Sequence, residues 1–68
     1  MTMYQNIIKD LFPDEDTDPR HVEGYLRLRF GTLDHLSRED FKEECLAALD
    51  AIDMDPKAAE QLAQSYGL

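Results

Sequence analysis

The chain has 68 residues, of which 15 are acidic and seven are basic, so its formal net charge at neutral pH is -8. Residues 1–68 are enough for one small acidic domain with a modest core, and so few basic residues exclude a surface that binds nucleic acid directly. The single cysteine excludes an internal disulfide. Without a signal segment or an apolar run of membrane-spanning length, we expect a cytoplasmic protein that does not enter a membrane.

The first predicted helix spans residues 2–12, where apolar side chains recur at the spacing of an amphipathic helix. The proline that follows ends it, because the residue before a proline is pushed out of the helical conformation. In the acidic segment beyond, Asp14, Asp16 and Asp18 have the alternating spacing of the first ligands in a calcium-binding loop. Pro19 stands where such a loop needs glycine, so we expect Asp18 to cap a helix that begins at Pro19.

The second predicted helix spans residues 19–30 and is the most ambiguous, because apolar and arginine side chains alternate over residues 25–30 as they do in a strand. The sequence offers no second strand to pair with it, and we therefore favour the helix. Gly31 is placed to end this helix with a left-handed residue. On the helix Leu28 points away from the apolar side while Arg29 lies near its middle, a local inconsistency of a kind that is sometimes functional.

The third and fourth predicted helices span residues 38–53 and 56–66. Ser37 has the context of a helix cap, with an acidic residue three positions later, and Asp55 repeats the Asp-Pro start of the second helix. Gly67 closes the last helix. We therefore predict an all-α fold, a compact bundle of four short helices. Its expected core consists of Ile7, Leu11, Val22, Leu26, Phe41, Cys45, Leu49, Ile52 and Leu62.

Apart from the alternating aspartates, no residue pattern indicates catalysis, a cofactor or a metal site. Cys45 lies on the apolar side of the third helix, where a thiolate would be disfavoured. The two histidines, His21 and His35, have no partners at the spacing of a zinc site. A chain this short also has little volume for a substrate pocket. We therefore expect no enzyme activity and no bound cofactor.

Two surfaces remain as candidates for function. The first is acidic and collects carboxylates from the proline-flanked segment and from the outer face of the third helix. The second is apolar, because one small core does not accommodate all the remaining large apolar side chains. Those side chains are Leu28, Leu33, Met54 and Leu68. The candidate partner-binding residues are Asp14, Glu15, Asp16, Leu28, Leu33, Glu39, Glu43 and Asp50.

The leading hypothesis is a small acidic protein-interaction module that binds another protein, one with a basic surface, through an apolar patch rimmed by carboxylates. An alternative is an inhibitor from a phage or mobile element that mimics nucleic acid on a basic target surface. A third is a calcium-binding domain. The spare apolar surface also leaves a homodimer open. The first two hypotheses differ in salt dependence, since a purely electrostatic contact collapses as salt rises.

Overall fold

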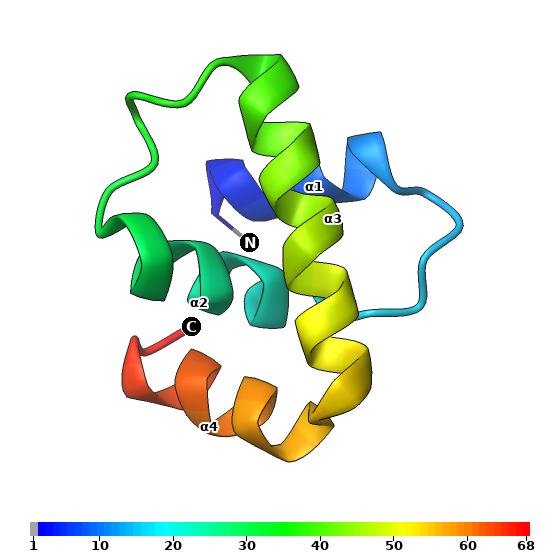
Figure 1. Cartoon of the computed structure of the whole chain (residues 1–68), viewed down its shortest axis with the longest axis vertical. Coiled ribbons are helices and arrows are strands. Elements are labelled where there is room, and N and C mark those ends of the chain that lie inside the picture. Colours follow the sequence, from blue (N-terminus) through cyan, green and yellow to red (C-terminus); the bar gives the residue numbers. More distant parts are fainter. Residues whose placement is uncertain (1) are drawn as a thin grey trace.

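The computed structural model describes residues 2–68 and is all-α over that range, without strands. In Figure 1 the third helix stands upright in front of the first, the second helix lies beside it, and the fourth runs from its lower end back along the second. Residues 25–30, which also suited a strand, are helical. Each helix agrees with its predicted position to within a residue at either end. The helices are α1 (Met3–Leu11), α2 (Pro19–Phe30), α3 (Arg38–Met54) and α4 (Pro56–Ser65).

Side-chain caps start the helices, as the sequence predicts. Asp18, Ser37 and Asp55 each accept a hydrogen bond from a backbone N–H in the first turn of the following helix, at 3.0, 3.1 and 3.2 Å. Pro19 and Pro56 occupy the first helical positions, where a missing N–H has no cost. Each such cap stabilises the fold by about 1 kcal/mol, so the boundaries of these helices are locally determined.

Both glycines that were expected to end helices have positive φ, 73° at Gly31 and 71° at Gly67. After α4 the Leu68 N–H donates to the carbonyl of Ala63 at 2.9 Å, and the Gly67 N–H donates to that of Gln64 at 3.0 Å. These two bonds form a Schellman motif. The chain therefore turns back onto the last turn of α4, and Leu68 is half-buried there.

Helix α2 is the centre of the fold, because it lies against each of the other three helices. Only three of its twelve residues, Arg20, Leu28 and Arg29, are exposed. Its approach to α4 is close at Gly24, where there is room for a methyl group but not for a larger side chain. A Cβ at this position would lie 3.4 Å from the Cα of Ala63. The crossing of α2 and α4 thus depends on small residues on both helices.

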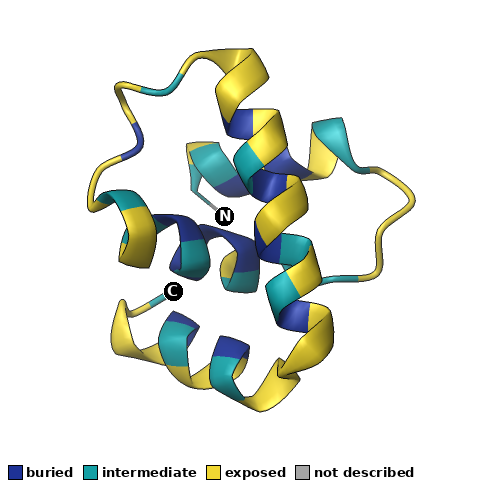
Figure 2. Ribbon diagram, in the orientation of Figure 1, coloured by how far each residue is buried: buried dark blue, intermediate teal, exposed yellow. Residues whose placement is uncertain are grey.

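The buried faces of the helices meet in one core, drawn in dark blue in Figure 2. Five predicted core residues are buried, namely Val22, Leu26, Phe41, Cys45 and Ile52. The other four are only half-buried; they are Ile7, Leu11, Leu49 and Leu62. The core also contains Ile8, Leu33, Ala48, Ala59 and Ala63. Three of these are alanines, because closely approaching helices favour small side chains at their contacts.

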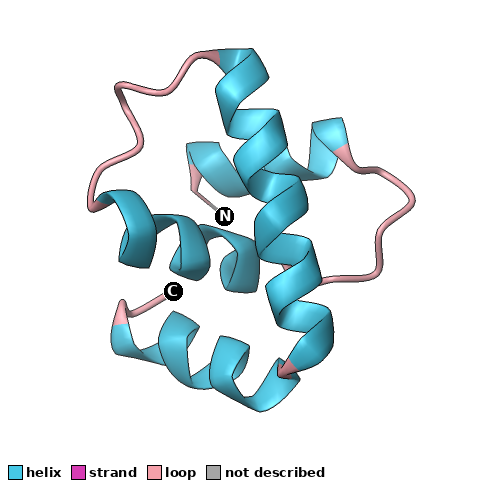
Figure 3. Ribbon diagram, viewed as in Figure 1, coloured by secondary structure: helices cyan, strands magenta, loops and turns pink. Residues whose placement is uncertain are grey.

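Two longer connections, residues 12–18 and 31–37, extend to opposite sides of the view in Figure 3. The first contains the acidic segment, and the second runs from α2 to the start of α3. Over residues 2–68, no helix combines the length and the apolar character needed to cross a membrane.

Candidate protein-binding surface

An apolar groove lies between α2 and α3, and we call it the α2/α3 groove. Leu26 and Ala48 form its floor, since both are buried in the core. Leu28 stands at its edge with 61% of its surface exposed. Ala47 and Ala51 are too small to fill the space beside it. The groove is lined by Tyr25, Leu26, Leu28, Arg29, Glu44, Ala47, Ala48 and Ala51.

One side of α3 forms a row of side chains along this groove. The row begins with Glu44, continues over Ala47 and Ala51, and ends with Met54. Spacings of three and four residues bring these side chains to one side of the helix. Met54 is 87% exposed and extends the apolar strip beyond the groove itself. With a rise of 1.5 Å per residue, the row from Glu44 to Met54 is about 15 Å long.

An ion pair joins the two walls of the groove. The Nη1 atom of Arg29 lies 3.6 Å from Oε1 of Glu44, and the two side chains are 65% and 27% exposed. The same guanidinium lies over the ring of Phe30, 5.5 Å from its centroid. The sequence placed Arg29 on the apolar side of α2, and its long side chain carries the charge out to the rim. An exposed pair of this length contributes little to stability.

The acidic residues predicted to bind a partner are all exposed; they are Asp14, Glu15, Asp16, Glu39, Glu43 and Asp50. The structure brings Glu15 of the first connection together with Asp50 and Asp53 of α3, which line one depression. Leu49 lines it too, and positions 49 and 53 project from the opposite side of α3 to Ala47 and Ala51. Acidic side chains therefore lie on both sides of α3. Glu44 lines the α2/α3 groove, and Glu15, Asp50 and Asp53 line the depression on the other side.

The prediction that Leu33 belongs to an exposed apolar patch is wrong. Leu33 is 3% exposed and is part of the core, although it lies in the connection between α2 and α3. The connection is held against α1 because the Tyr4 hydroxyl donates a hydrogen bond to Asp34, the next residue. Of the four spare apolar side chains, only Leu28 and Met54 are exposed.

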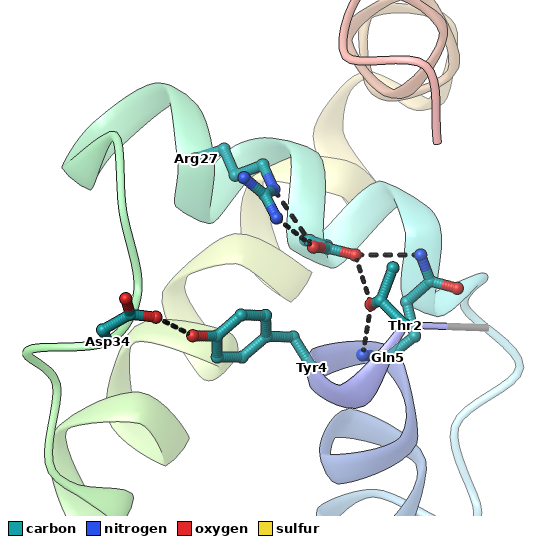
Figure 4. A network of polar contacts seen from close by, with 6 residues as sticks. Thr2, Tyr4, Gln5, Arg27 and Asp34 are labelled. Carbon is teal, nitrogen blue, oxygen red and sulfur yellow. Dashed lines mark hydrogen bonds and ion pairs between the residues drawn. The ribbon is translucent and has the colours of Figure 1, made fainter.

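Glu23, for which no sequence pattern indicates a role, is the most buried charged residue of the described chain, with 0% of its surface exposed. Its Oε1 atom accepts hydrogen bonds from Thr2 Oγ1 and Gln5 Nε2 of the α1 region, both at 2.8 Å. Its Oε2 atom accepts from Nε and Nη2 of Arg27 at 3.0 and 2.9 Å (Figure 4). Burial raises the pKa of this carboxyl, but the hydrogen bonds outweigh it and hold the pKa below its ordinary value.

The calcium hypothesis depended on alternating aspartates, and Asp18 is already engaged. Its Oδ1 atom caps α2, and its Oδ2 atom lies 2.6 Å from Nη2 of Arg20. Over residues 2–68, no three His, Cys, Asp or Glu side chains are grouped closely enough to hold a metal. Burial, with a smaller effect of Glu44, raises the pKa of the Cys45 thiol to about 12, so this thiol stays protonated at neutral pH.

No protein-family model, curated protein sequence or solved structure matches this chain. Its function is therefore inferred from its own surfaces.

Proposed function

We propose that this chain is a small, non-enzymatic protein-interaction module that binds another protein through the α2/α3 groove, an apolar patch rimmed by carboxylates. The observation that carries this proposal is the exposure of Leu28 beside Ala47 and Ala51. These residues leave an apolar groove that the domain does not fill. Covering the exposed part of Leu28 contributes about 1–2 kcal/mol, and apolar grooves between helices are a common way of binding another protein.

Charge favours a basic partner over a second copy of the chain. The net charge of -8 repels another copy and attracts a positively charged surface over about 10 Å at moderate salt. Glu44 lines the groove, and Glu43 is exposed next to it on α3. A partner that covers the groove therefore meets these two carboxylates as well as the guanidinium of Arg29 at its rim.

Affinity capture from the source cell tests this proposal, with wild type, Leu28→Asp and Met3→Asp as baits. Both variants add one carboxylate at an exposed apolar position, but Met3 lies on α1 and does not line the groove. We expect a partner that wild type and Met3→Asp retain at high salt and that Leu28→Asp loses. Equal retention by all three baits would contradict the proposal.

A second candidate function is an inhibitor, encoded by a phage or mobile element, that mimics nucleic acid on a basic target. The observation in its favour is the exposure of Glu39, Glu43 and Asp50 along α3, with Glu15 beside Asp50. Binding of this kind collapses as salt rises. It is also lost when Glu39, Glu43 and Asp50 are changed to lysine, while Leu28→Asp leaves it intact. The same capture experiment, run at low and high salt, separates the two functions.

A further inference from the structure

The α2/α3 groove has the dimensions of a site for a helix. The part of α3 that lines it, from Glu44 to Ala51, is about 10 Å long, and residues i, i+4 and i+7 of a bound helix span about the same length. Ala47 and Ala51 lie in the middle of the row, where small side chains let a helix backbone approach closely. An extended peptide that binds by strand addition would instead need a free sheet edge, and residues 2–68 form no strand. A helix brings its own backbone hydrogen bonds.

The ion pair between Glu44 and Arg29, at the charged end of the groove, is weak. Glu44 is the one carboxylate among the lining residues, and its contact with Arg29 at 3.6 Å is longer than the 2.7–2.9 Å of a strong charged hydrogen bond. Arg29 also lies over the ring of Phe30, so it keeps a favourable neighbour when it leaves Glu44. Another cation can therefore replace Arg29 at this carboxylate.

We infer that the partner presents a basic amphipathic helix, whose apolar residues cover Ala47 and Ala51 beside Leu28 and whose lysine or arginine replaces Arg29 at Glu44. The inference rests on the proposed function and specifies the shape and charge of the partner. Arg29 then pairs with Glu44 in the free protein and competes with the partner's cation for this carboxylate. Apolar side chains supply the contact area, and the exchange of cations at one end sets the orientation of the bound helix.

A synthetic helix tests the inference directly. The probe is a peptide of about 15 residues of alanine, leucine and lysine, with leucines at i, i+4 and i+7 and lysines beside them. A scrambled peptide of the same composition has the same charge and no apolar side. In an NMR titration of the full chain, we expect the helical peptide to shift the amide signals of Leu28, Ala47 and Ala51. Equal shifts with the scrambled peptide, or shifts confined to other regions, would overturn the inference.

Two matched pairs of variants test the exchange at Glu44. Arg29→Gln removes the internal competitor, while Arg38→Gln removes the same charge from an exposed arginine that does not line the groove. We expect Arg29→Gln to tighten peptide binding about threefold beyond the effect of Arg38→Gln. Glu44→Gln should weaken binding more than Glu39→Gln, which changes an exposed acid outside the groove. Equal effects within each pair would show long-range attraction without exchange, and would overturn the proposed role of Arg29.

The peptide titration tests the helix inference, and the capture experiment tests the proposed function, so one can be contradicted without the other. If a natural partner depends on Leu28 but the two peptides bind alike, the helix inference is wrong and the proposed function stands. If no natural partner depends on Leu28 and the peptides bind alike, both are wrong. Circular dichroism of each variant confirms that the helices are intact before binding is compared.

Discussion

The Glu23 carboxylate is buried on α2 and accepts two hydrogen bonds from Arg27, one helical turn further on, at 3.0 and 2.9 Å. Its other oxygen accepts from Thr2 and Gln5, each at 2.8 Å. A buried carboxylate is costly unless its charge is paired and its oxygens are hydrogen-bonded. Arg27 supplies the charge, and the α1 region supplies the remaining donors. The acid therefore joins α1 to α2 through polar contacts beside the apolar core.

Replacement of Glu23 by alanine should lower the free energy of unfolding by about 2–3 kcal/mol, because the buried Gln5 amide and the Arg27 guanidinium lose their acceptor. Urea denaturation at neutral pH measures this loss. Glu43→Ala is the control, since it removes an exposed acid from α3 and should change the stability by about 0.5 kcal/mol or less. Similar losses of unfolding free energy in the two variants would show that the hydrogen bonds around Glu23 do not stabilise the fold.

Acidification should remove the contribution of Glu23. The pKa of this carboxyl is lowered in the folded protein, so its stabilising effect is full above the unfolded value of about 4.3 and is lost as the pH falls through the lower native value. Asp18 acts in the same direction, because hydrogen bonding by Arg20 lowers its pKa. A comparison of wild type with Glu23→Gln isolates the first effect. The gap between their unfolding free energies should narrow from pH 7 to pH 3, and a constant gap would contradict the assignment.

The two leucines predicted for one exposed patch should respond differently to truncation. Leu33→Ala removes a side chain that is 3% exposed, and we expect it to cost about 2–4 kcal/mol of stability. Leu28→Ala removes one that is 61% exposed and should cost about 0.5 kcal/mol or less. Thermal unfolding of the two variants measures both effects. Equal costs would mean that Leu28 is also part of the core.

The crossing of α2 and α4 should tolerate one methyl group at Gly24 and no more. In Gly24→Ala the new Cβ makes an ordinary contact 3.4 Å from the Cα of Ala63, and alanine favours the helix by up to about 1 kcal/mol. We expect this variant to be as stable as wild type or slightly more stable. Gly24→Leu should lose about 2 kcal/mol or more, because its larger side chain pushes α4 away. Calorimetry of the two variants decides, and a large loss in Gly24→Ala would contradict the observed spacing.

The Cys45 thiol should resist modification in the folded protein. It is buried, and its pKa is raised to about 12, so little thiolate forms at neutral pH. A disulfide reagent should therefore label it only at the rate at which the domain opens, and labelling should be complete in denaturing urea. Fast labelling without denaturant would show that α3 leaves the core readily.

The helix boundaries could be predicted from the sequence because local chemistry determines them. Asp18, Ser37 and Asp55 cap helices through the next few residues, and Gly31 and Gly67 end them. None of these signals depends on a distant part of the chain. The exposure of Leu28 was predictable for the same reason, since helical spacing alone points it away from the apolar side of α2.

The remaining features depend on long-range contacts that periodicity does not report. Leu33 lies in a connection, where no helical spacing indicates which side chains are buried. The network of Glu23 brings in donors from residues 18 and 21 positions away, and only Arg27 is near it in sequence. The close approach of α2 to α4 at Gly24, where a Cβ would lie 3.4 Å from the Cα of Ala63, is visible only once the helices are packed.

The central place of α2 also determines how this sequence can diverge. Nine of its twelve residues are at least partly buried, so most substitutions there disturb a neighbouring helix and are removed by selection for stability. Leu28 is free of that constraint, because its side chain is 61% exposed. A lineage that keeps an apolar residue at position 28 does so for a reason outside the fold, and this site is where natural variation would record the presence of a partner.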